Sequence, residues 1–405
     1  MIEILGFNKR DFFFSSLLIV MIISRGFLPP YAADIFLMLG TLIALGNLLH
    51  QPLHRNTRFM ICWIHLYITV TLIGFFDGVE PKAIAVSIFY YLIALGIFFI
   101  LKRLVDTPEA IFDFMQLYCF IVGLISLATL VSGVFFYLLR RASPLLYMRN
   151  NVARGAGLYG NPNYYAISVL IAVGFVMGII RFGKKDEFSK WNRLLLIIFC
   201  LDILFTFSRG AWVSLGMMSL FFSLPLLSKE KVSAKTLAVF WILVICLLFF
   251  TLIYGHVLKA AVFDSFAEFG RFVMRRLEDL LWGTGSGRYD IWLEGFEHFS
   301  SSWWSFIFGL GGNQSGYYST LQQQPHNGYL KSLYENGILG FTLVMILIFR
   351  LLKTSFNVGI LKVKSPLFFP LLGLCVMSLS NDVFILKEFW IVSSLALIFD
   401  DLDVY

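Results

Sequence analysis

Residues 111–137 read IFDFMQLYCFIVGLISLATLVSGVFFY, a continuous apolar run in which Asp113 is the single charged residue. About 20 such residues cross the hydrocarbon core of a bilayer as one helix. The whole chain follows the same trend, because 59% of its 405 residues are hydrophobic and 14% are charged, against about 45–50% and about 25% in average proteins. This composition excludes a cytosolic enzyme, a nucleic-acid-binding protein and a disordered scaffold. The sequence predicts an integral membrane protein.

Apolar runs of membrane-spanning length recur along the rest of the chain. They predict about twelve transmembrane helices, at 12–28, 31–49, 59–76, 83–101, 111–137, 163–181, 193–207, 210–227, 236–254, 336–352, 366–383 and 387–400. The run at 193–227 is divided into two short spans because Ser208-Arg209-Gly210 interrupts it. We therefore expect an all-α integral membrane protein with a single polytopic domain over residues 1–405. One large helical segment is expected outside the membrane, between the ninth and tenth spans.

Lysine and arginine in the short loops predict the orientation of these spans, since both residues are enriched on the cytoplasmic side. One set of loops, with the N-terminal segment, holds Lys9, Arg10, Arg55, Arg58, Lys102, Arg103, Arg181, Lys184, Lys185, Lys190, Arg193, Lys229, Lys231, Lys235, Arg350, Lys353, Lys362 and Lys364. We predict that this set is cytoplasmic. Both termini are then cytoplasmic, and Asp382 lies outside.

Two segments on the predicted outer side break this charge rule. The periplasmic connection at 138–162 and the large periplasmic segment at 255–335 are rich in basic residues: Arg140, Arg141, Arg149, Arg154, Lys259, Arg271, Arg275, Arg276, Arg288 and Lys331. Arginine binds phosphate and carboxylate in a bidentate manner, although long loops also cross regardless of charge and some arginines anchor to lipid headgroups. Arg209 differs from these, because an arginine at membrane depth is costly and usually functional.

The large outer segment is predicted to lie along the membrane surface. Residues 264–281 and 289–299 show the apolar spacing of amphipathic helices, which suits helices at an interface. Trp303-Trp304 supplies an aromatic anchor at headgroup depth. The GTGSG stretch at 283–287 lacks the lysine of a phosphate-binding loop, and we interpret it as a hinge.

His326 is the histidine whose placement indicates chemistry, because it lies on the predicted outer side beside the start of a span. A neutral imidazole can take a proton from a sugar hydroxyl as a general base, and arginines can stabilise a departing diphosphate. Neither a carboxylate pair of the glycosidase kind nor a DxD-like metal motif stands out on that side. The five cysteines lie in apolar runs without metal-ligand spacing. We therefore expect no metal and no other cofactor.

Four short motifs, in their order along the chain, resemble the O-antigen polymerase and O-antigen ligase superfamily of polytopic membrane glycosyltransferases. They are Arg154 with GLYGNPNYYA at Gly157–Ala166, FSRGAW at Phe207–Trp212, GRYDIW at Gly287–Trp292 and PHNGYLKSLYENGILG at Pro325–Gly340. Together with the span layout they cover roughly residues 150–345, whereas the first 140 residues or so are generic.

The resemblance implies a metal-independent enzyme that moves a glycan from undecaprenyl diphosphate to a hydroxyl acceptor on the periplasmic face of a bacterial inner membrane. It implies catalytic roles for Arg209 and Arg288, which would bind the diphosphate, and for His326, which would activate the acceptor. The substrate-binding residues taken from the matching motifs are Arg154, Asn161, Asn163, Tyr289, Asn327 and Glu335. Asn161 and Asn163 can equally well be interpreted as helix-capping residues. Glu335 can equally well be interpreted as an acidic residue near a helix start, where the helix dipole favours it.

The acceptor stays open at this stage. We favour a polymerase, whose acceptor is a second lipid-linked repeat unit, over a ligase that transfers to lipid A-core, with protein glycosylation third. A secondary transporter or lipid flippase is the alternative from another class, but no half-to-half repeat is visible and the charges gather at the outer end. Expected partners are an undecaprenyl-diphosphate-linked oligosaccharide and membrane lipids, with a chain-length regulator and a flippase as candidate proteins. No nucleic acid is expected.

Overall fold

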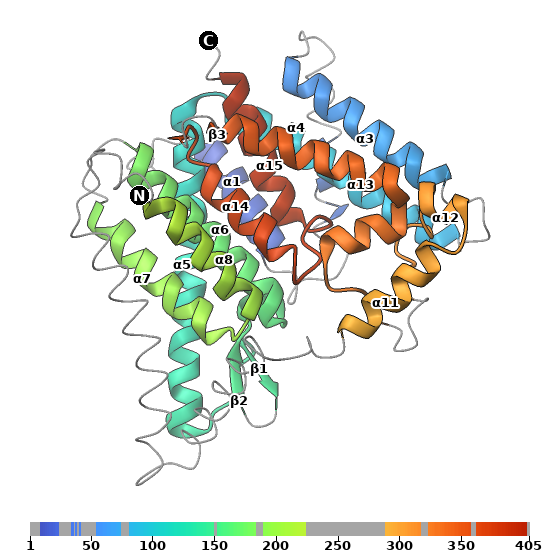
Figure 1. Ribbon diagram of the computed structural model, residues 1–405. Coiled ribbons are helices and arrows are strands. Elements are labelled where there is room, and N and C mark those ends of the chain that lie inside the picture. The colour runs from blue at the N-terminus through green and yellow to red at the C-terminus, as the bar shows by residue number, and fades with distance from the viewer. Residues whose placement is uncertain are drawn as a thin grey trace.

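The computed structural model is a helical bundle (Figure 1). It describes residues 9–23, 34–35, 37–38, 40–41, 54–73, 81–149, 152–183, 189–223, 288–316, 323–357 and 362–402. The helices are α1 (Lys9–Ile23), α3 (Arg55–Ile73), α4 (Pro81–Leu104), α5 (Pro108–Leu139), α6 (Pro162–Phe182), α7 (Ser189–Phe205), α8 (Arg209–Ser223), α11 (Arg288–Phe299), α12 (Trp303–Phe308), α13 (Gly328–Ser355), α14 (Phe368–Met377) and α15 (Lys387–Leu402).

Four of the described helices are long and apolar enough to cross a membrane: Ala85–Leu104 within α4, and α5, α6 and α13. Shorter apolar helices lie at Asp11–Ile23 and Phe368–Met377. The membrane character predicted from the sequence is therefore confirmed, while the number of about twelve spans stays a prediction. The span predicted at 236–254 lies outside the described residues, as does most of the one at 31–49 and the amphipathic helix at 264–281.

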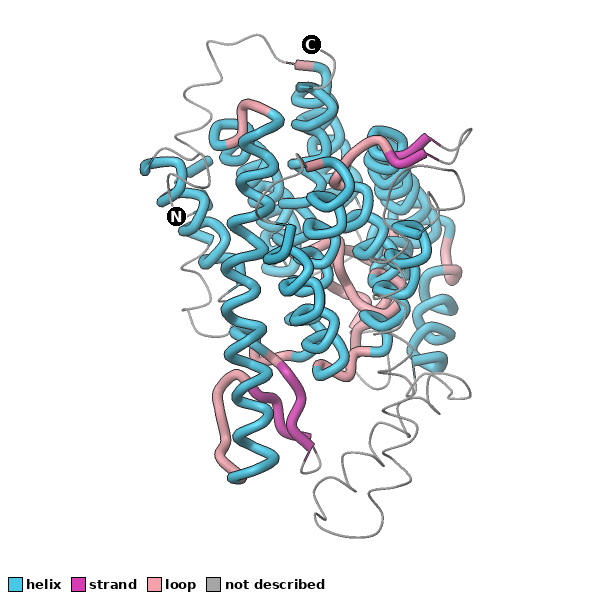
Figure 2. The backbone as a smooth tube through the Cα atoms, turned by 90° about the vertical axis from the view of Figure 1, so that its left-hand side faces the viewer, coloured by secondary structure: helices cyan, strands magenta, loops and turns pink. Residues whose placement is uncertain are grey.

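Two short strand pairs accompany the helices and were not predicted. β1 (Leu146–Arg149) pairs antiparallel with β2 (Val152–Gly155), with Leu146 opposite Gly155. β3 (Phe356–Asn357) pairs with β4 (Lys362–Val363) in the connection after α13. A single-turn 3-10 helix, Gly157–Tyr159, follows β2 and leads into α6. The β1–β2 hairpin lies beside the end of α5, beyond most of the other helices (Figure 2).

The central helix of the bundle is α6, because 83% of its apolar window is buried against 39% for α5. It packs on α5, α7, α8 and α14. Two glycines allow the closest approach: a Cβ atom on Gly174 would lie 2.5 Å from the backbone nitrogen of Pro370, and one on Gly178 would lie 2.4 Å from the carbonyl oxygen of Pro366. Small residues permit such backbone contact between membrane helices, so these positions fix how α6 meets α14.

A kink divides α13 near the point where a span was predicted to begin, at residue 336. Gly337 has a left-handed backbone, with φ of 64°, which glycine adopts without the steric cost of a Cβ atom. A Cβ atom there would lie 2.2 Å from the carbonyl oxygen of Ile307 in α12. The first turns of α13 therefore form a separate segment packed on α12, and the longer apolar part follows the kink.

The predicted span at 366–383 is a helix only over Phe368–Met377. Its polar end, Ser378-Leu379-Ser380-Asn381-Asp382, instead forms turns before α15 begins at Lys387. Serine, asparagine and aspartate side chains compete for backbone hydrogen bonds and favour turns over helix interiors. This difference matters for function, because the turn at 378–386 becomes the centre of the candidate site.

Charged and polar residues from three loops predicted to be cytoplasmic and from the C-terminal end of α15 meet at one end of the bundle, and we call this group the inner cluster. Its members are Asn56, Lys102, Arg350, Asp400 and Asp401. The Asn56 amide donates to Leu397 O and Asp400 Oδ2, both at 2.9 Å, and Arg350 donates to Asn56 Oδ1. Lys102 Nζ lies 3.9 Å from Asp401 Oδ2. The grouping agrees with the predicted loop assignment, although the compartment that each end faces stays a prediction.

Candidate active site

The turn at 378–386 receives the start of α13, which carries the histidine motif. The backbone N–H of Gly328 donates to the carbonyl oxygens of Ser378 at 2.8 Å and of Asn381 at 3.1 Å. Gly328 is packed so closely that a Cβ atom would lie 3.1 Å from the Phe384 ring. Residues 326–328 are thereby fixed against a turn that lies about fifty positions further along the chain.

The same turn contacts the segments that carry two predicted catalytic arginines. Arg288, the first residue of α11, donates from Nη1 to the carbonyl oxygen of Ser380 at 3.1 Å. Gly210 packs against the same serine, since a Cβ atom on Gly210 would lie 1.8 Å from Ser380 Oγ. Arg209 precedes Gly210 and is the first residue of α8. Two motifs separated by almost eighty residues therefore meet at Ser380.

His326 lies two residues before the start of α13, within electrostatic reach of Arg288, and is exposed. Its backbone is left-handed, with φ of 50°, and the preceding carbonyl, of Pro325, accepts a 2.7 Å hydrogen bond from Trp292 Nε1 in α11. Partial burial lowers the pKa of His326, the positive charges of Arg288 and Lys331 lower it further, and the Asp382 carboxylate opposes them. The imidazole is thus favoured in its neutral form, which a general base requires.

Two further motif residues flank His326 in different environments. Asn327 is buried and caps α13, its side-chain oxygen accepting from the N–H groups of Tyr329 at 3.0 Å and Leu330 at 3.2 Å. This is the usual N-cap arrangement, so the predicted substrate contact would have to share that oxygen. Tyr289 in α11 is 65% exposed, and its side chain is available to a ligand at the surface.

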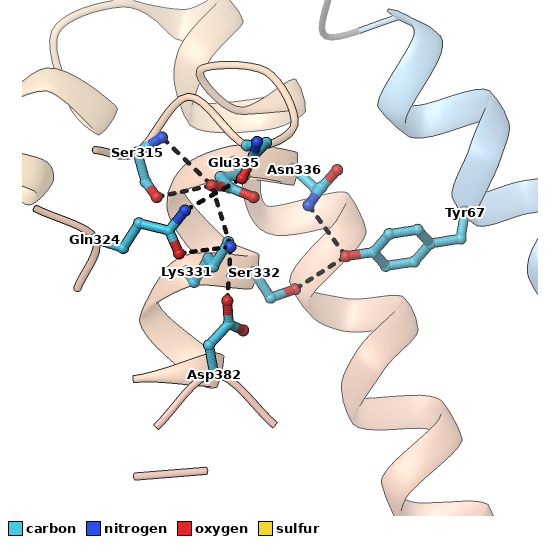
Figure 3. A network of polar contacts seen from close by, with 9 residues as sticks. Tyr67, Ser315, Gln324, Lys331, Ser332, Glu335, Asn336 and Asp382 are labelled. Atoms are coloured by element: carbon cyan, nitrogen blue, oxygen red, sulfur yellow. Dashed lines mark hydrogen bonds and ion pairs between the residues drawn. The ribbon is translucent and has the colours of Figure 1, made fainter. Parts of the chain in front are cut away.

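A buried charge network that was not predicted begins at Lys331, in the first turns of α13 (Figure 3). Lys331 Nζ lies 2.6 Å from Asp382 Oδ2, 2.9 Å from Gln324 Oε1 and 3.9 Å from Glu335 Oε1. The Lys331 and Asp382 side chains are 5% and 7% exposed. An i,i+4 pair of Lys331 and Glu335 is visible in the sequence, but the pairing with Asp382 spans 51 positions and has no local signal.

Glu335 joins this network to the loop before α13. Its Oε1 accepts hydrogen bonds from Ser315 Oγ at 2.7 Å and from Ser315 N at 3.3 Å. Its carbonyl oxygen accepts from Gly311 N at 3.0 Å. Glu335 is 6% exposed and lies two residues before the Gly337 kink. Its side chain orders the 311–316 loop, and the predicted substrate contact stays a prediction.

On the other side of α13 the network continues to α3 through a hydroxyl group. Asn336 Nδ2 donates to Tyr67 Oη at 3.0 Å, and Ser332 Oγ lies 3.3 Å from the same atom. Two small cavities, each of about 20 Å³, border Lys331, Glu335 and Asn336. Such a volume holds about one water molecule. The cavities are therefore too small for a sugar, and the contact of a substrate with the exposed His326 stays a prediction.

Arg154 is 5% exposed and bonded to the turn that presents Arg209. Its Nε donates to the carbonyl oxygen of Thr206 at 2.9 Å and its Nη2 to that of Phe207 at 3.3 Å. These carbonyls follow the end of α7, and Phe207 has a left-handed backbone with φ of 52°. A cation satisfies such helix-end carbonyls favourably. Arg154 thus supports the α7–α8 turn, whatever further role it has.

Asn161 and Asn163 lie at the start of α6, and the structure places Asn161 as its N-cap. The side-chain oxygen of Asn161 accepts from the backbone N–H of Asn163 at 2.9 Å, and Pro162 occupies the first helical position. This is the capping interpretation that the sequence allowed. The Asn163 side chain is partly exposed, and its contact with a substrate remains a prediction.

Within the described ranges, no group of three His, Cys, Asp or Glu side chains is arranged to hold a metal ion. The expectation that transfer needs no metal stays a prediction. The site described above therefore consists of an exposed imidazole, two arginines at the first turns of two helices and a buried acid–lysine network.

A comparison with protein families tests the resemblance stated from the sequence motifs. Residues 194–345, less than half of the chain, match the family model described as O-Antigen ligase. The resemblance to the O-antigen polymerase and ligase superfamily is confirmed. The matched residues of this chain include Arg209, Arg288, His326 and Glu335. Arg154 and the Asn-Pro-Asn turn at 161–163 lie before the matched residues. No curated protein matches the chain.

Proposed function

We propose that this member of the superfamily is a glycosyltransferase that moves a glycan from undecaprenyl diphosphate to the hydroxyl group of a second lipid-linked repeat unit. One observation carries the proposal: segments of three separate motifs meet the turn at 378–386. Arg288 donates to Ser380, Gly210 (next to Arg209) packs on Ser380, and the N–H of Gly328, two residues after His326, donates to Ser378 and Asn381. The reaction takes place at the periplasmic face of the bacterial inner membrane, where both substrates present their headgroups. A chain-length regulator and a flippase are the candidate protein partners.

The geometry supports a direct displacement at the anomeric carbon of the donor. The acceptor hydroxyl oxygen forms the new bond to that carbon, and the bond between the carbon and the diphosphate oxygen breaks. The diphosphate leaves with the bonding electron pair, and Arg209 and Arg288 stabilise its added negative charge. His326 accepts the hydroxyl proton. Because its pKa is lowered, the imidazole is ready to act as base at neutral pH.

A ligase that transfers the glycan to lipid A-core is the second candidate, because the matching family model is described as O-Antigen ligase. Both enzymes would use the same donor, arginines and histidine, and they would differ in the acceptor. A transporter or flippase would not require a general base beside the two arginines. The superfamily match favours the enzymes over transport.

The test is deletion of the gene in its own strain, with lipopolysaccharide examined on gels. A core that carries a single repeat unit would establish the polymerase. Bare core with accumulated lipid-linked polymer would establish the ligase instead, and unchanged lipopolysaccharide would contradict both.

Complementation then assigns the chemistry to the site. The wild-type gene should restore the missing glycan, whereas H326A should not, at equal amounts of membrane-inserted protein on an immunoblot. Full restoration by H326A would remove His326 from the mechanism and with it the basis of the proposal.

A further inference from the structure

Glu388, the second residue of α15, is a buried acid that the mechanism above does not use. It is 3% exposed, and no ion pair within the described ranges joins it to a lysine or an arginine. Its Oε1 accepts a 2.5 Å hydrogen bond from Tyr159 Oη. The dipole of α15 would favour an acid here on the surface as well, whereas a buried carboxylate is costly unless its hydrogen bonds compensate. The bond from Tyr159, 229 positions earlier in the chain, supplies that compensation.

Tyr159 ends the 3-10 helix that directly precedes the start of α6. Burial raises the pKa of its hydroxyl group, and the negative charge of Glu388 raises it further, so the phenol keeps its proton and donates it to the carboxylate. The same hydroxyl group forms a hydrogen bond with Ser168 Oγ in α6. One side chain thus joins the start of α15 to the first turns of α6.

Residues 160–163, which follow Tyr159, carry the exposed part of the Asn-Pro-Asn turn. Gly160 and Asn161 are exposed, and Asn163 is partly exposed. A Cβ atom on Gly160 would have no neighbour within 4 Å, so packing around this glycine does not hold the segment. Its position depends on its two ends, which are Tyr159 and α6. An asparagine amide donates and accepts uncharged hydrogen bonds, which suits the hydroxyl groups of a sugar.

The region where α15 begins holds two motif segments through two acids. Asp382, in the turn at 378–386, binds Lys331 of α13, and Glu388, just after that turn, binds Tyr159. Tyr164, directly after the Asn-Pro-Asn turn, interacts electrostatically with Lys331. The asparagine segment and the histidine motif are thereby held at the same end of the bundle.

We propose that Glu388 is a positioning residue for the substrate: through Tyr159 it fixes residues 160–163, so that Asn161 and Asn163 bind hydroxyl groups of the lipid-linked glycan. The inference rests on the proposed function and extends it, because the arginines bind the diphosphate and the asparagines bind the sugar part. Since Glu388 acts through Tyr159 and not on His326, its loss weakens the binding of the glycan and leaves the chemical step intact.

Hydrogen exchange of the full-length protein in detergent, read by mass spectrometry, measures the opening of residues 157–165 in the absence of any substrate. Tyr159→Phe and Glu388→Leu each remove the link and should speed exchange of these amides about 10–100-fold, the effect of one hydrogen bond to a charged group. The double variant should exchange no faster than either single one, because both remove the same contact. Glu388→Gln keeps an oxygen that can accept from Tyr159 and should stay close to the wild type.

Tyr118→Phe is the matched control for Tyr159→Phe. Tyr118 Oη donates to the carbonyl oxygen of Ser168 at 3.4 Å, so this variant removes a hydroxyl group from the same part of the bundle without removing the link. Lys387→Met is the matched control in α15, since it removes the ion pair with Asp34 beside Glu388. Both controls should exchange at the wild-type rate in residues 157–165.

Transfer kinetics then test what the segment binds. Tyr159→Phe and Glu388→Leu should raise the KM for the lipid-linked substrate about tenfold at an unchanged kcat, which is the signature of lost uniform binding. The two controls should leave both constants unchanged. The pH profile of the variants should match that of the wild type, because His326 is not altered.

Wild-type exchange rates in both Tyr159→Phe and Glu388→Leu would overturn the proposal. Faster exchange at an unchanged KM would overturn it as well, because the link would then support the fold alone, and so would a lower kcat at an unchanged KM. A wild-type protein that transfers no glycan would instead contradict the proposed function, and the exchange rates would still decide whether Glu388 fixes the segment.

Discussion

The two ends of the bundle contain similar polar residues that are used differently. In the inner cluster, Arg350 donates to Asn56 and stacks 4.8 Å above the Phe59 ring, so that it joins α13 to α3. At the opposite end, the Lys331–Asp382 pair is buried, whereas His326, five residues before Lys331, is exposed. The inner cluster connects helix ends, and we predict that the charges at the opposite end support a group that a substrate reaches. The two ends therefore differ in how their charges are arranged, and the experiments below test whether that difference matters for transfer.

The largest expected difference between the two ends concerns their histidines. His326→Ala should reduce glycan transfer by about 10²–10⁴-fold, the usual contribution of a general acid–base group. His54 is exposed at the start of α3 in the opposite end, and His54→Ala should leave transfer unchanged. Both variants are assayed in membranes with a lipid-linked donor and acceptor. Equal losses in the two variants would show that the comparison between the ends has no functional meaning.

The next difference concerns the lysines. Lys331→Met leaves Asp382 and Glu335 buried without their cation, and should lower the free energy of unfolding by about 3–5 kcal/mol. Lys102→Met removes a longer ion pair, of 3.9 Å to Asp401, together with a hydrogen bond to Thr57 Oγ1, and should cost less, about 1–2 kcal/mol. Thermal unfolding in detergent measures both.

A matched double variant separates the effect of charge from that of packing at the Lys331–Asp382 pair. Lys331→Met with Asp382→Asn removes both charges of the close pair and should regain part of the lost stability. If the double variant unfolds at a lower temperature than Lys331→Met alone, the buried pair is not what stabilises this end.

Arg154 should show a smaller effect that reaches the site through the α7–α8 turn. Arg154→Ala removes the two hydrogen bonds that the guanidinium donates, and each is worth about 1.5–3 kcal/mol of stability. It also leaves the carbonyl oxygens of Thr206 and Phe207 without this donor. We expect a lower melting temperature and a raised KM for the donor, with Arg154→Lys intermediate. Arg141→Ala, in the exposed part of the same connection, is the control. Lost transfer at an unchanged melting temperature would instead favour direct substrate binding by Arg154.

Much of the helical layout could be predicted from the sequence, because apolar runs report directly on membrane helices. The expected span at 163–181 is α6 at Pro162–Phe182, and the expected break at 208–210 lies where α7 ends and α8 begins. The β1–β2 hairpin could not be predicted, since its strands, LYMR and VARG, are short and have no alternating pattern.

The candidate site was predictable in its motifs but not in its assembly. Arg209, Arg288 and His326 each follow from a motif, whereas the turn that joins them was included in a predicted span because residues 366–383 are mostly apolar. Hydropathy does not indicate which distant backbone groups will meet. The Lys331–Asp382 pair was missed for the same reason, since it joins a helix residue to a turn residue 51 positions further along the chain.

The smallest expected difference concerns the pH at which protonation of His326 lowers the rate of glycan transfer. Its pKa is lowered from 6.5 by partial burial and by Arg288 and Lys331, and the neutral imidazole is the active form. The kcat/KM for transfer should therefore be highest at pH values well above the lowered pKa and should fall as the pH drops through it. Arg288→Gln removes a cation that lowers the pKa, so it should move this fall to higher pH as well as reducing the rate. Asp382→Asn removes the opposing carboxylate and should move the fall to lower pH.

The control is Arg58→Gln. Since Arg58 lies at the other end of the bundle, this variant should leave the pH profile unchanged. Shifts of the same sign in Arg288→Gln and Asp382→Asn would contradict an electrostatic origin, because the two side chains carry opposite charges.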